Sequence, residues 1–67
     1  MNYFLRVSHF HEDRFASYWA EESLKFKVVD RSTVLIFNPN AVQLKKLEGW
    51  CRVTRATLSP NYGIDVA

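Results

Sequence analysis

The sequence predicts an α+β domain with the element order βαββαβ, in which a four-stranded antiparallel sheet carries both helices on one face, as in ferredoxin-like folds. Two observations favour this fold. The spacing of apolar residues alternates along the chain between the period of a strand and that of a helix. Residues typical of turns and helix caps separate these segments. The main alternative is a three-stranded sheet with one long helix, because the second helix is short enough to be marginal.

The first two elements are defined by their periodicity. In residues 3–8, Tyr3, Leu5 and Val7 share one face, which predicts a half-buried strand. Residues 11–23 then show helical spacing and begin with acidic side chains, which suit the N-terminal end of the helix dipole. The aromatic stripe of this helix is expected to pack on the sheet; it consists of Phe15, Tyr18 and Trp19.

A hairpin is predicted next. Leu24, Phe26 and Val28 alternate with polar or exposed positions, and residues 33–37 form a second β-rich run. Between them, residues 30–32 are turn formers. Two strands joined by such a short polar segment indicate a β-hairpin.

The second helix is expected to start at Asn38 and Pro39, since Asn is a favoured cap and proline is well tolerated at the first helical position. Gly49 stands where helices commonly end in a left-handed turn, which predicts a helix of about ten residues. Residues 50–58 then read as a fourth strand, and residues 59–63 as a turn. After this turn, Ile64, Asp65 and Val66 are expected either to form a short extra strand or to remain a loose tail.

Length and composition indicate that residues 1–67 form a single globular domain. It is 48% hydrophobic and 24% charged, with a formal net charge of +2. It has one cysteine, so no disulfide can form within the chain, and two histidines, too few soft ligands for the usual structural zinc site. No cofactor or metal is therefore expected. The sequence shows neither a membrane span nor a signal peptide, and we expect a cytoplasmic protein.

The best candidate binding surface is the face of the sheet that points away from the helices. Alternation places on it a basic set with one aromatic ring: Phe4, Arg6, Lys25, Lys27, Arg52 and Thr54. Together with a surplus aromatic, these give the expected partner-binding residues Phe4, Arg6, Lys25, Lys27, Trp50 and Arg52. Alternatively, the same face is merely solvated, and its lysines discourage edge-to-edge aggregation.

Two further groups of side chains invite a chemical interpretation. His9 and His11 lie two residues apart and suggest a metal ligand pair or a general base, although no third ligand or nucleophile stands at a recognisable distance. Cys51 would be a nucleophile only with a lowered pKa, and a small core residue on the fourth strand is the favoured interpretation. No catalytic residue is predicted, and the chain is not expected to be an enzyme.

Three functional hypotheses follow. The preferred one is a non-enzymatic protein-binding module, an inhibitor or accessory subunit that docks on a larger protein or nucleoprotein assembly. Chains of this size without catalytic apparatus are common among phage and mobile-element inhibitors such as anti-CRISPR proteins, although no motif here matches one. The second is a single-stranded RNA or DNA binder that uses the basic sheet face, although the glycine and aromatic run of RNA recognition modules is absent. The third is a small enzyme with a histidine base at a dimer interface. A homodimer is a secondary expectation, because the core is small.

Overall fold

The computed structural model describes residues 1–62, so the predicted extra strand at residues 64–66 lies outside the described residues. The elements follow the order β1 (Asn2–Arg6), α1 (Glu12–Trp19), a 3-10 helix η1 (Ala20–Glu22), β2 (Phe26–Asp30), β3 (Thr33–Ile36), α2 (Ala41–Thr54) and β4 (Thr57–Asn61). The predicted α+β class and order of elements are confirmed.

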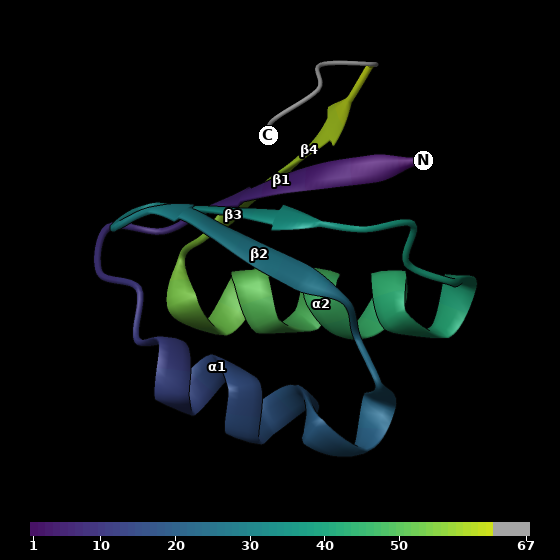
Figure 1. The fold of residues 1–67 in the computed structure, drawn as a ribbon, viewed down its shortest axis with the longest axis horizontal. Helices are drawn as coiled ribbons and strands as arrows, with labels where there is room; N and C mark the ends of the chain where they lie inside the picture. The colour runs from purple at the N-terminus through teal and green to yellow at the C-terminus, as the bar shows by residue number, and fades with distance from the viewer. Residues whose placement is uncertain (63–67) are drawn as a thin grey trace.

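The four strands form one antiparallel sheet in the order β2-β3-β1-β4. Both helices lie on the same side of this sheet (Figure 1). The register sets Leu5 of β1 opposite Val34 of β3 and Leu58 of β4, and these side chains face the helices. Because side chains alternate along a strand, Phe4 and its partner Leu35 face the other way.

The hairpin between β2 and β3 is confirmed, including its turn. The backbone N–H of Ser32 donates to the carboxylate Oδ1 of Asp30 at 2.8 Å, an interaction typical of polar turn residues. This hydrogen bond lowers the pKa of Asp30 below its ordinary value. A register shift between Val28 and Asp30 adds a bulge to the exposed edge strand β2, which makes that edge a poorer template for another strand.

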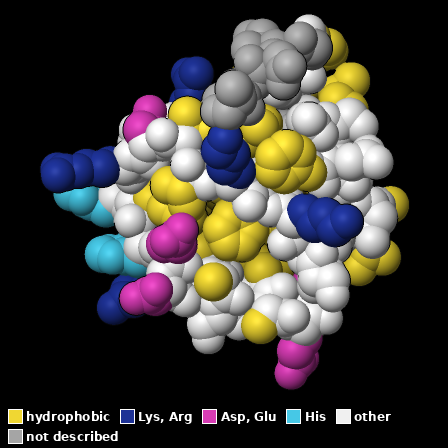
Figure 2. Space-filling model, in the orientation of Figure 1, with side chains coloured by type: hydrophobic (Ala, Val, Ile, Leu, Met, Phe, Trp, Pro, Cys, Tyr) yellow, Lys and Arg dark blue, Asp and Glu magenta, His cyan; other side chains and the backbone are white. Residues whose placement is uncertain are grey.

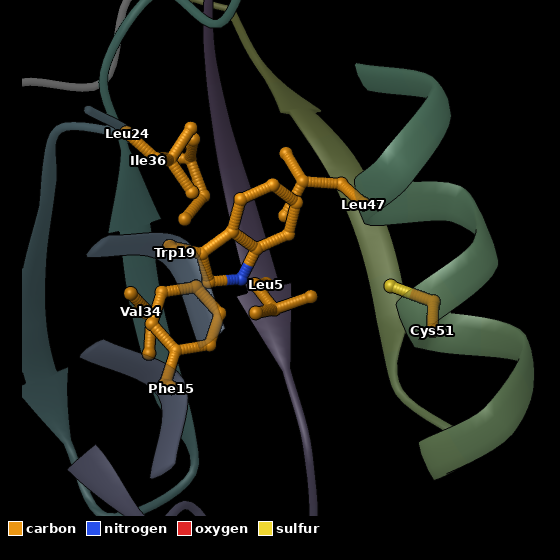
Figure 3. Close-up of a cluster of buried hydrophobic side chains, with 8 residues drawn as sticks. All are labelled: Leu5, Phe15, Trp19, Leu24, Val34, Ile36, Leu47 and Cys51. Carbon is orange, nitrogen blue, oxygen red and sulfur yellow. The ribbon is translucent and has the colours of Figure 1, made fainter. Parts of the chain in front are cut away.

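The core fills the space between the sheet and the helices (Figure 3); it contains Leu5, Phe15, Trp19, Leu24, Val34, Ile36, Leu47 and Cys51. Phe15 packs edge-on against Phe26, with 4.7 Å between ring centroids, and against Trp50, with 5.3 Å. Trp19 is 2% exposed and is therefore a core residue, whereas Tyr18 is 56% exposed and does not belong to the buried stripe.

The second helix begins two residues later than predicted. Its N-cap is Asn40, whose side chain accepts a hydrogen bond from the backbone N–H of Gln43, while Gln43 accepts one from the backbone N–H of Asn40. This reciprocal pair is a capping box. Asn38 instead has a positive φ of 40° and accepts a hydrogen bond from the amino group of Met1. The capping box with Gln43 therefore distinguishes Asn40 from Asn38 as the start of the helix.

The prediction that the helix ends at Gly49 and that residues 50–58 form a strand was wrong. The helix continues to Thr54 and ends at Arg55, which adopts the left-handed conformation. Trp50 and Cys51 follow Leu47 at the spacing of one helical face and pack toward the core. Their burial outweighs the cost of a glycine inside a helix, which is about 1 kcal/mol. The fourth strand therefore starts at Thr57, and the residues predicted as a turn, Ser59 to Asn61, belong to it.

Candidate functional site

The surface predicted to bind a partner is only partly assembled. Phe4 on β1 lies opposite Leu35 on β3, which in turn lies opposite Lys27 on β2. Arg6 lies two residues after Phe4 on the same side, and Lys25 lies two residues before Lys27. We call this surface the outer sheet face; it is formed by Phe4, Arg6, Lys25, Lys27 and Leu35. Neither helix covers it (Figure 1).

The other predicted residues lie elsewhere, because they are helical. Trp50, Arg52 and Thr54 were expected on a fourth strand, but all three belong to α2, on the opposite side of the sheet. Trp50 is half-buried against Phe15, and Arg52 is exposed in the last turn. Trp50, Arg52 and Thr54 therefore cannot share a binding surface with Phe4.

The outer sheet face is basic and has an apolar centre. Arg6, Lys25 and Lys27 are exposed, whereas Leu35 is 2% exposed and Phe4 is half-buried. Asp30, the last residue of β2, is the acidic residue of that strand. Phe4 therefore supplies the accessible apolar surface of this face beside three exposed cations, which suits a partner that carries carboxylates or phosphates.

A second concave site lies on the helix side of the sheet. A pocket of about 370 Å³ opens between the loop after β1, helix α1 and the C-terminal half of α2. Its lining residues are Val7, Ser8, His9, His11, Arg14, Phe15, Tyr18, Trp50 and Thr54. Figure 2 shows the histidine side chains (cyan) at one edge of the molecule, beside Lys or Arg side chains (dark blue).

His9 and His11 both line this pocket. Within residues 1–62, no group of three or more His, Cys, Asp or Glu side chains is arranged to hold a metal ion. Sequence reasoning selected His9, His11 and Trp50 separately and missed Arg14 and Tyr18. The spacing of His11, Arg14 and Tyr18 on one helical face was available as a signal. The opposite wall of the pocket, formed by α2, could not be predicted, because residues 50–54 were expected to be a strand.

Cys51 is buried in the core, as expected, but on α2 and not on a strand. Burial raises the pKa of its thiol, and the nearby carboxylate of Glu48 raises it further. A neutral, buried thiol is a poor nucleophile.

Polar contacts join the C-terminal end of η1 to the N-terminal half of α2. Gln43 donates from its side-chain amide to the backbone carbonyl of Glu22 at 2.7 Å, and Lys46 forms a salt bridge with the Glu22 carboxylate. These contacts hold the end of η1 against α2, and the residues that make them do not line the pocket.

Within residues 1–62, no helix is both long enough and apolar enough to cross a membrane. Comparisons with models of known protein families, with curated proteins and with solved structures found no match.

Proposed function

We propose that this chain is a non-enzymatic protein-binding module, an inhibitor or accessory subunit that docks through its outer sheet face on an acidic surface of a larger protein or nucleoprotein assembly. The observation that carries the proposal is the arrangement of the half-buried Phe4 on a helix-free face with the exposed cations Arg6, Lys25 and Lys27. Apolar groups at the centre of a contact supply binding energy, and surrounding cations supply orientation and speed of association.

The position of the cations supports this assignment. Lys27 on the edge strand β2 and Lys25 just before it are both exposed, so a partner can reach them without rearrangement of the fold. On the helix side, by contrast, Lys46 already pairs with Glu22. The ionic groups of the outer sheet face are thus available to an external carboxylate.

A second candidate function rests on the same face. A single strand of RNA or DNA also presents negative charge and planar groups, and Phe4 is an aromatic ring among cations, as in proteins that bind single strands. This alternative predicts a steep loss of affinity as salt increases. A histidine-based enzyme, the third hypothesis, has less support, because His9 and His11 line a pocket in which Cys51, a buried thiol, takes no part.

We also propose that the topology of the sheet is ferredoxin-like. In the order β2-β3-β1-β4, strand β3 separates β1 from β2, and β1 separates β3 from β4. Each βαβ unit is therefore split by one antiparallel strand, which supports a ferredoxin-like arrangement. In such an arrangement both crossovers lie on one side and the other side of the sheet stays available for binding.

The test compares two double variants that each remove two positive charges. Lys25→Gln/Lys27→Gln changes the outer sheet face, and Lys45→Gln/Arg52→Gln changes exposed positions on α2. Tagged wild-type protein and both variants are used for capture from the native host, with and without nuclease, after circular dichroism has shown that each is folded. We expect a defined protein that survives nuclease and is lost from the sheet variant alone.

The other outcomes contradict the proposal in different ways. Recovery of nucleic acid that nuclease or salt removes would replace it with the second function. Equal loss from both double variants would show that net charge and not the outer sheet face directs binding. Light scattering could also give twice the monomer mass for the wild type and the monomer mass for the sheet variant alone. That result would make the partner a second copy of this chain.

A further inference from the structure

We infer that the pocket between α1 and α2 is a binding site for a nucleoside monophosphate, that is, a planar base and sugar carrying a phosphate monoester. The pocket has a volume of about 370 Å³. Sites for small organic ligands range from about 300 to 1,000 Å³, so this pocket holds more than a single inorganic ion. It shares no residue with the outer sheet face, and the inference stands independently of the proposed docking function.

The polar groups of the pocket favour an anion. Arg14 presents a guanidinium group, and His9 and His11 present imidazole rings that can each donate a hydrogen bond. Within residues 1–62, these three side chains make no hydrogen bond or ion pair. The nearest carboxylates in the sequence, Glu12 and Asp13, do not line this pocket; they line an adjoining recess, which His11 and Arg14 also line. The lining of the pocket itself therefore contains free donors and no carboxylate.

The number of donors favours a phosphate over a carboxylate. A carboxylate has two oxygens, which a single arginine can engage bidentately. A phosphate monoester has three terminal oxygens and accepts hydrogen bonds from several directions. The pocket offers the forked guanidinium of Arg14, the two imidazoles and the hydroxyl group of Ser8. This set matches a phosphate and would leave donors unused around a carboxylate.

The remaining walls favour a planar ring. Phe15 forms the buried base, and Trp50 packs edge-on against it at a centroid distance of 5.3 Å. Tyr18 is more than half exposed, although aromatic side chains of this size usually contribute to burial. The exposed parts of Tyr18 and Trp50 provide apolar surface on which a nucleobase can stack, since every base has a π-face.

The α2 wall adds a polar group away from the cationic residues of α1. Thr54 donates its hydroxyl proton to the backbone carbonyl of Trp50 at 2.8 Å, which leaves the hydroxyl oxygen as an acceptor. An acceptor there suits a sugar hydroxyl or an exocyclic amino group. The phenyl ring of phosphotyrosine carries no such donor, whereas the sugar and base of a nucleotide do, and this difference favours a nucleotide.

The experiment measures binding of adenosine 5′-monophosphate to the folded chain by isothermal titration calorimetry and by amide chemical shifts. We expect saturable binding, with shifts at Arg14, Tyr18 and Trp50, and at least about tenfold weaker binding of adenosine, which lacks the phosphate. Arg14→Gln and His11→Gln should each weaken nucleotide binding, the former by at least about tenfold. Arg52→Gln, an exposed arginine of α2 outside the pocket, is the matched control and should leave the affinity unchanged.

Further ligands identify the source of the nucleotide. A short oligonucleotide with a 5′-phosphate that binds as tightly as the free nucleotide, while its unphosphorylated form does not, would assign the pocket to the end of a strand. Binding of the free nucleotide alone would assign it to a metabolite. The inference would be overturned if phosphotyrosine bound more tightly than the nucleotide, or if adenosine bound as tightly. It would also be overturned if Arg14→Gln and Arg52→Gln lost nucleotide affinity equally, or if no saturable binding occurred.

Discussion

The capping box of α2 yields the sharpest stability prediction. In the Asn40→Ala variant, the backbone N–H of Gln43 loses the side-chain acceptor that lies 2.8 Å away. Loss of an asparagine cap typically costs about 1 kcal/mol, within a range of about 0.5 to 2 kcal/mol. The cap is exposed, so water partly replaces the lost acceptor, and we expect a value near the middle of this range.

This cost is measurable because the chain is short. For 67 residues, the free energy of unfolding is expected to be roughly 3 to 10 kcal/mol. A loss of 1 kcal/mol lowers the midpoint of thermal unfolding by about 4 to 8 °C in a domain of this size. Urea titration followed by far-ultraviolet circular dichroism, with the combined fluorescence of Trp19 and Trp50 as a second probe, gives the change in free energy.

The control for Asn40→Ala is Asn38→Gly. Asn38 is the cap that the Asn-Pro pair suggests, yet it lies in the left-handed region with a φ of 40°. Glycine adopts that conformation without strain, so the variant removes only an exposed hydrogen bond with the amino group of Met1. We expect a loss of no more than about 0.5 kcal/mol. A larger loss for Asn38→Gly than for Asn40→Ala would refute the assigned start of the helix.

Three further predictions concern the helix interior, the turn and the thiol. Gly49→Ala should stabilise the chain by about 0.5 to 1 kcal/mol in thermal melts, because the residue is helical and no described atom lies within 4 Å of the added methyl; destabilisation would mean that the helix ends there. The pKa of Asp30 is lowered in the folded state, so its stabilising effect is complete above the unfolded value of about 3.9 and is lost as the pH falls through the lower folded value. Urea titrations at neutral and acidic pH should therefore differ less in Asp30→Asn than in the wild type, and an equal difference would contradict this. Cys51 is buried and its pKa is raised, so at neutral pH it should react with a maleimide far more slowly than glutathione does. In urea the thiol should react fully. Rapid reaction of the folded chain would show that the thiol is exposed.

The first half of the fold could be predicted from local pattern. In β1, alternation assigns Leu5 to the core and Arg6 to the solvent, and the structure agrees. The turn formers at residues 30–32 likewise predict the hairpin. These features depend on neighbours in sequence and on a strict period of two, so they can be recognised without knowledge of the rest of the chain.

The candidate sites were harder to predict. Phe4, Arg6 and Lys27 were correctly grouped, because alternation on adjacent strands is enough to place them on one face. The pocket was not foreseen, because its walls come from two helices separated by much of the sequence. Arg14 and Trp50 have no local pattern that brings them together.

The class of fold, the order of the elements and the inward and outward faces of the first three strands follow from the periodicity of apolar residues, and they could be predicted from local pattern. The end of α2, by contrast, depends on packing between distant parts of the chain, since Gly49 is a common stop signal. Burial of Leu47, Trp50 and Cys51 against the sheet extends the helix past that glycine, since packing over several residues exceeds the preference of one. The same extension removes Arg52 from the outer sheet face and places Trp50 in the pocket with Arg14.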